Sequence, residues 1–134
     1  MSNFTPTPFI LLLVLSCHAV ASQSMTPDGF WTSDRFQVSF ESELKPIVIN
    51  QIHQWIIQVQ TLDGVPVSKA EISFDGGMPD HDHGLPTVPQ VTENLGDGRY
   101  RVEGLRFHMQ GLWELKITIQ ADNMEDVVTI SLEL

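Results

Sequence analysis

Apolar and polar residues alternate along most of the chain beyond residue 34. Six segments carry this strand pattern: residues 35–41, 53–60, 70–75, 98–104, 112–120 and 127–134. A period of two is typical of half-buried antiparallel strands. No segment shows a convincing apolar period of 3.6 residues. We therefore predict an all-β chain.

Turn residues separate the predicted strands at LDGVP (62–66) and GDGR (96–99). Six or seven short strands in about 100 residues predict an immunoglobulin-like antiparallel β-sandwich of about seven strands. Tyr100 follows GDGR as the tyrosine of a tyrosine corner would, with its hydroxyl bonded back to the chain. The alternation assigns these residues to the core: Phe36, Phe40, Trp55, Ile57, Ile72, Phe74, Val102, Phe107, Trp113, Leu115 and Ile117.

One long segment, Gly76 to Gly98, lacks a strand pattern and contains the sequence GGMPDHDHGLP (76–86). Irregular segments of this length in a small domain are usually functional or disordered. Pro79, Pro86 and Pro89 restrict the backbone and favour an ordered loop.

The first 21 residues have the features of an export signal. Their apolar run is far shorter than the roughly 20 residues of a membrane-spanning helix. The small residues AVA before residue 22 suit signal peptidase, so we expect cleavage after Ala21. Two alternatives remain open: an uncleaved anchor, and a lipoprotein acylated on Cys17, the single cysteine.

After cleavage we expect a linker at 22–33 and one domain at 34–134, periplasmic or secreted, with no membrane span in the mature chain. The formal net charge is −10, and residues 1–21 contribute no charged side chain. A surface this acidic repels phosphate backbones, so nucleic acid is not an expected partner. The chain shows no nucleophilic triad with framing glycines and no phosphate loop, so we expect no enzyme and no catalytic residues. Composition leaves one alternative, a catalytic zinc held by two histidines and a carboxylate.

The segment 76–86 holds candidate metal ligands. His81 and His83 would project the same way if the residue between them were extended. Met78 precedes them, and RFHMQG (106–111) offers His108 and Met109. Imidazole suits several transition metals, whereas a thioether is soft and favours Cu(I).

Each candidate also has an ordinary structural explanation. The HDH sequence can be a solvated turn, and Met109 continues an alternation that would bury it as core filler. His108 would then face solvent or the loop. His53 shares a face with Trp55 and reads as a structural histidine.

Three motifs follow one another here: a proline-flanked H-x-H-G loop, then G-x-G-x-Y, then F-x-M-x-G-x-W before a strand. They comprise His81, His83 and Gly84; Gly96, Gly98 and Tyr100; and Phe107, Met109, Gly111 and Trp113. In this combination, residues 76–119 resemble YtkA-like domains, which are related to FixH-type proteins. Residues 30–75 agree only in strand pattern.

The resemblance implies a small exported or membrane-tethered β-sandwich associated with copper handling and sometimes with cytochrome oxidase assembly. It favours His81, His83 and Met109 as ligands. Many relatives have methionine after HG, where this chain has Leu85, and the anchor of FixH proteins has no counterpart.

We therefore expect a copper-binding or copper-chaperone domain, with Cu(I) favoured and with a copper-receiving or copper-donating exported protein as partner. Imidazole must be neutral to ligate, so binding should weaken as pH falls through the free-histidine pKa of about 6.5. The alternative is an immunoglobulin-like structural or protein-interaction module without a metal site.

Overall fold

The computed structural model describes residues 25, 26 and 28–134. The predicted signal at 1–21, with Cys17, lies outside the described residues, as does the expected cleavage site. In the described part every regular element is a β-strand, which confirms the predicted fold class. No helix there is long and apolar enough to cross a membrane.

The strands of the described part are, in chain order, β1 (Trp31–Thr32), β2 (Phe36–Ser42), β3 (His53–Thr61), β4 (Glu71–Met78), β5 (His83–Gly84), β6 (Gln90–Gly96), β7 (Arg99–Leu105), β8 (Leu112–Ala121) and β9 (Met124–Glu133). All six predicted strands are present, as β2, β3, β4, β7, β8 and β9. β1 falls within the segment 22–33, which we expected to be a linker.

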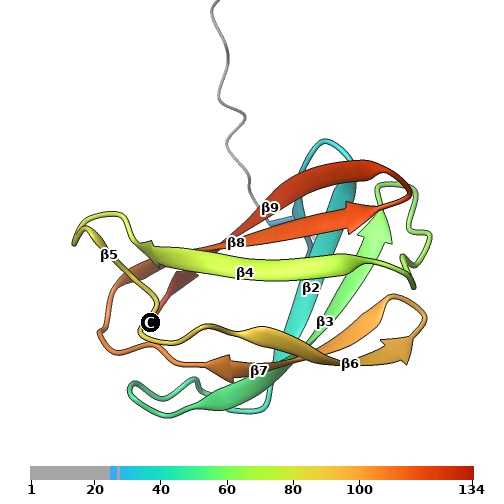
Figure 1. Ribbon diagram of the computed structural model, residues 1–134. Coiled ribbons are helices and arrows are strands. Elements are labelled where there is room, and N and C mark those ends of the chain that lie inside the picture. The colour runs from blue at the N-terminus through green and yellow to red at the C-terminus, as the bar shows by residue number, and fades with distance from the viewer. Residues whose placement is uncertain (1–24, 27) are drawn as a thin grey trace, which may run out of the picture.

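The strands form two layers around one core (Figure 1). β1, β2, β3, β7 and β6 make one layer, and β4, β8 and β9 make the other. On one side a single residue pair, Ser73 with Gln90, joins β4 to β6. On the other side β9 contacts β1 and β2. The sheet therefore wraps almost completely around its core, as an antiparallel sandwich that approaches a closed barrel.

The expectation of one irregular segment from Gly76 to Gly98 is wrong. β4 continues to Met78, and residues 90–96 form β6. β6 was missed because its pairing with β7 shifts register between Val91 and Glu93 and again between Asn94 and Gly96. Each shift interrupts the period of two on which the sequence reasoning depends.

Two tight hairpins have the turn residues that their backbone requires. Asp97 and Gly98, between β6 and β7, have φ of 50° and 72°. Asp122 and Asn123, between β8 and β9, have φ of 50° and 61°. A two-residue hairpin turn with positive φ at both positions strongly prefers glycine, asparagine and aspartate. The predicted turn GDGR is confirmed.

The core confirms the predicted alternation. Nine of the eleven residues predicted for it are buried, and Phe40 and Ile72 pack against it while partly buried. The Tyr100 hydroxyl donates a hydrogen bond of 2.6 Å to the carbonyl of Val67. It therefore bonds back to the chain as predicted, but 33 residues upstream, whereas a tyrosine corner bonds only a few residues upstream. Burial raises the pKa of Tyr100, and a smaller influence of the Ala70 backbone opposes this shift.

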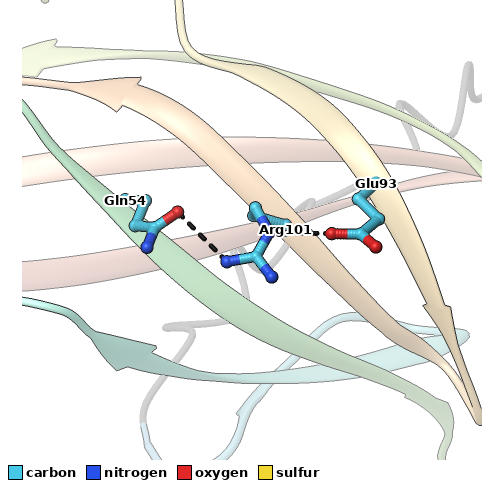
Figure 2. Close-up of polar contacts among 3 residues, drawn as sticks. All are labelled: Gln54, Glu93 and Arg101. Atoms are coloured by element: carbon cyan, nitrogen blue, oxygen red, sulfur yellow. Dashed lines mark hydrogen bonds and ion pairs between the residues drawn. The ribbon is translucent and has the colours of Figure 1, made fainter.

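The outer face of the β3–β7–β6 layer is polar, as Figure 2 shows for one cross-strand contact. Arg101 on β7 donates through Nε to Glu93 Oε2 on β6 at 2.9 Å, and through Nη1 to Gln54 Oε1 on β3 at 3.2 Å. The ion pair is at the surface, where such pairs contribute about 0–1 kcal/mol. The contact links three strands beside the first register shift of β6.

One end of the molecule gathers the segments with the candidate ligands (Figure 1). The β4–β5 turn, the β7–β8 connection at 106–111 and the C-terminus lie there together. Gly111 and Leu134 exchange backbone hydrogen bonds of 2.8 and 3.1 Å. The β2–β3 connection reaches the same end, because the Asn50 N–H donates to the carbonyl of Phe107 at 2.7 Å.

Candidate metal site

The β4–β5 hairpin positions the histidines of the HDH sequence. Met78 and His83 are paired residues of β4 and β5, and the turn between them holds His81, whose N–H donates to the Met78 carbonyl at 3.1 Å. A Cβ added to Gly77 would lie 2.5 Å from the His83 carbonyl oxygen. The hairpin can therefore close only because residue 77 has no side chain.

His81 and His83 are not joined by the extended segment that would make their side chains point the same way. Asp82 between them has φ of 52°, so the segment is a turn and not extended. The two rings nevertheless stack, with centroids 5.8 Å apart and an interplanar angle of 18°. The turn, rather than strand geometry, brings them together.

The β7–β8 connection brings a third histidine to this end. Residues 106–111 form no strand, so strand alternation does not fix the directions in which His108 and Met109 point. The His108 ring lies 4.8 Å from that of His83 and packs edge-on against Trp113 at 5.3 Å. His108 thus faces the loop, which was one of its two expected orientations. Trp113 is fully buried, and its indole donates to the Met109 carbonyl at 3.0 Å, which fixes the connection.

Two imidazole nitrogens at this end are shielded from solvent and have no hydrogen-bond partner among the described residues. They are Nδ1 of His83 and Nδ1 of His108, on the two rings that contact each other. Leaving a buried polar atom unpaired costs about 1–3 kcal/mol, so proteins seldom do so without a reason. An unpaired imidazole nitrogen can accept a metal ion.

The two candidate methionines differ in burial. Met78 is 2% exposed and is the cross-strand partner of His83, so their side chains share a face of the hairpin. A Cβ added to Gly111 would lie 3.0 Å from Met78 Cε, so the thioether reaches the β7–β8 connection. Met109 is 37% exposed, so the alternation that would bury it as core filler was misleading.

As the side chains stand, no three His, Cys, Asp or Glu groups in the described part of the chain are arranged to hold one metal ion. A site at this end therefore needs a methionine sulfur beside the inner histidine pair, or a rotation of the exposed His81. An open hollow of about 450 Å³ reaches Met78 and His83, and its walls include Asp82, Glu114 and Lys116.

His53 is a structural histidine, as expected. Its Nε2 accepts a 3.1 Å hydrogen bond from the Trp55 indole, which can only donate. Its Nδ1 lies 3.1 Å from the Gln51 carbonyl, which can only accept. Nδ1 therefore carries the proton and neither nitrogen is free for a metal.

The comparison with protein families extends the resemblance seen in the motifs. The chain matches the YtkA-like family over residues 32–118, a wider span than the 76–119 that carried the sequence resemblance. Neither the curated proteins nor the solved structures give a significant match. Because residues 32–118 are well over half of the chain, this protein belongs to the YtkA-like family.

Proposed function

We propose that this protein is a small exported copper-binding domain that carries the ion as cargo between other proteins. The observation that carries the proposal is the pair of shielded, unpartnered Nδ1 atoms on the contacting rings of His83 and His108. The His108 ring packs against Trp113, while the β4–β5 pairing fixes the backbone of His83, whose ring lies 6.4 Å from that of Trp113. Such a pair offers two nitrogen ligands without disturbing the core.

Met78 is the preferred sulfur ligand in this proposal, with Met109 as the second choice. Its burial and its pairing with His83 favour it. A set of two imidazoles and a thioether suits Cu(I) better than zinc, whose structural sites are usually four-coordinate and often contain cysteine. His81 adds a third imidazole at the rim of the site.

A protein that receives or donates copper would dock at the same end. Two exposed large apolar side chains adjoin the ligands: Met109 in the β7–β8 connection and Leu112 at the start of β8. Two more, Val48 and Ile52, lie in the β2–β3 connection, whose Asn50 bonds to Phe107. These four side chains would form an apolar rim beside the proposed ligands. It equally supports the second candidate function, a protein-interaction module that uses the rim and binds no metal.

Export belongs to the proposal, with cleavage between Ala21 and Ser22 and a periplasmic or secreted mature form. Intact-mass analysis of the protein from its native cell fractions tests it. A mature chain beginning with a lipidated Cys17 would contradict it and tether the domain to a membrane.

The decisive test of copper binding is a Cu(I) titration of the mature chain against a chromophoric chelator without oxygen, with Zn(II) and Cu(II) titrated separately. We expect one tightly bound Cu(I) per chain and weaker binding of both divalent ions. The double variant His83→Ala/His108→Ala should lose more than the roughly 10–100-fold that removal of a supporting partner of a metal ligand costs.

Gln110→Ala is the matched control, because Gln110 is an exposed residue of the same connection as His108. Its affinity should equal that of the wild type. A wild-type chain that binds no Cu(I), or a double variant that binds it equally well, would contradict the proposal. The first result would favour the interaction module.

A further inference from the structure

We propose that His81 is the exchange ligand of this site: it takes hold of the copper ion at the surface and passes it to and from the inner ligands. The inference rests on the proposed function and adds a division of labour among the three histidines. His83 and His108 hold the ion, whereas His81 sets how fast the ion enters and leaves.

Burial changes stepwise across the candidate ligands. Met78 is 2% exposed, and His83 and His108 are half-buried with Nδ1 shielded. His81 is exposed. The ligands thus form a path from a buried sulfur, through two partly covered imidazoles, to one imidazole in solvent. An ion that moves along this path can stay coordinated by side chains of the protein at every stage.

Ring contacts make the path continuous. The His81 ring stacks on His83 at 5.8 Å, and the His83 ring contacts His108 at 4.8 Å. The copper ion would therefore pass, at each step, between two neighbouring side chains. In the exchange itself, one bond from the ion to a protein ligand breaks as another forms, and no electron is transferred.

The location of His81 allows it to move. It lies in the turn between Met78 and His83, outside the strand pairing. As placed, it does not complete a three-histidine site with the inner pair. An exposed side chain changes rotamer in picoseconds to nanoseconds without displacing the core. His81 can therefore turn inward to the ion and outward to a partner, whereas the packed rings of His83 and His108 cannot.

The acidic neighbours of His81 suit such an entrance. Asp80 and Asp82 flank it in the sequence, and both are exposed. Asp82 also lines the hollow that reaches Met78 and His83. Carboxylates at a rim raise the local concentration of cations, which speeds their arrival more than it strengthens their binding.

The test separates equilibrium affinity from exchange rate. His81→Phe keeps a stacked ring and removes both ligand atoms, whereas His81→Met keeps a soft ligand atom. Cu(I) affinity is measured by competition, and the rate of Cu(I) transfer to excess chelator is measured by stopped flow. Gln110→Ala changes the neighbouring β7–β8 connection without removing an imidazole or a carboxylate and serves as control.

We expect His81→Phe to bind Cu(I) within about threefold of wild type and to transfer it about tenfold more slowly, which corresponds to about 1.4 kcal/mol in the barrier. His81→Met and Gln110→Ala should transfer at close to the wild-type rate. Unchanged transfer in His81→Phe would overturn the inference. So would a loss of affinity as large as that in His83→Ala/His108→Ala, because His81 would then be a permanent ligand. If the proposed function itself is wrong, the wild type binds no Cu(I), and this result is distinct from either failure of the inference about His81.

Discussion

His83 and His53 show how the same side chain can serve opposite purposes in one small domain. Both nitrogens of His53 are engaged, with Trp55 and with the Gln51 carbonyl. His83 keeps a shielded Nδ1 without a partner among the described residues, beside a second such atom on His108. Hydrogen bonding, more than burial, therefore separates the structural histidine from the candidate ligands.

Trp113 supports both the core and the candidate site. It packs edge-on against Phe107 at 5.3 Å and against His108 at 5.3 Å, and it is fully buried. Trp113→Ala should lower the free energy of unfolding by about 3–5 kcal/mol, the range for large aromatic core deletions. Chemical denaturation measures this loss. Trp113→Phe is the control and should cost less; a loss below about 1 kcal/mol for alanine would show that Trp113 is not a core residue.

Tyr100 gives the fold a dependence on alkaline pH. Its raised pKa means that the folded state holds the hydroxyl proton more tightly than the unfolded state does. This contribution to stability is complete below pH 10, the ordinary tyrosine value, and is lost as pH rises through the folded value.

Tyr100→Phe should lower the free energy of unfolding by about 0.5–1.5 kcal/mol at neutral pH, through loss of the hydrogen bond to Val67. Above about pH 10 the gap between wild type and variant should narrow. Urea denaturation of both proteins at pH 7, 9 and 10.5 measures this difference in the free energy of unfolding. If the difference in stability between wild type and variant widens as pH rises, the pKa of Tyr100 is lowered in the folded state, and the prediction is contradicted.

Among the elements, the β4–β5 hairpin depends most on a close approach of two backbones. A Cβ at residue 77 would meet the His83 carbonyl at 2.5 Å, whereas one at Gly84 would meet the Gly76 carbonyl at 3.2 Å. Gly77→Ala should therefore destabilise the protein by about 1–3 kcal/mol, as overpacking does, and weaken Cu(I) binding by displacing His83. Gly84→Ala, on the same hairpin, should lower both the stability and the Cu(I) affinity by less. Thermal unfolding and Cu(I) competition compare the two, and equal effects would contradict the close approach.

The sequence pattern predicts strands well where the period of two is unbroken. The pattern in β3 and β8 continues through nine and ten residues, with alternate residues buried along most of each strand. β6 escapes prediction because two register shifts interrupt its alternation. β5 escapes because two residues are too few to show any period.

The candidate site was partly predictable. His81 and His83 stand out by their spacing between prolines and glycines, and the structure brings His108 beside them. The burial of Met78 could not be predicted, because it depends on β4 continuing through two glycines, which are poor strand formers. The alternation in RFHMQG suggested a buried Met109, but the chain leaves the sheet at Leu105 and the pattern no longer reports burial.

On the scale of the whole molecule, the candidate chemistry lies at one end of the sandwich. The β4–β5 turn and the β7–β8 connection come from different parts of the sequence, and the wrapped sheet brings them together (Figure 1). The rings of His83, on β5, and His108, in the β7–β8 connection, lie near Trp113 of β8, while the turn leaves His81 in solvent. Exposed apolar side chains, among them Met109 and Leu112, lie at the same end.

The most direct test of this account is the X-ray absorption spectrum of the Cu(I)-loaded protein, recorded for the wild type, Met78→Leu and Met109→Leu. We expect imidazole scattering together with one sulfur neighbour in the wild type. The sulfur signal should vanish in Met78→Leu and persist in Met109→Leu. A spectrum without imidazole scattering, or a sulfur signal that survives in Met78→Leu, would contradict the site built from His83, His108 and Met78.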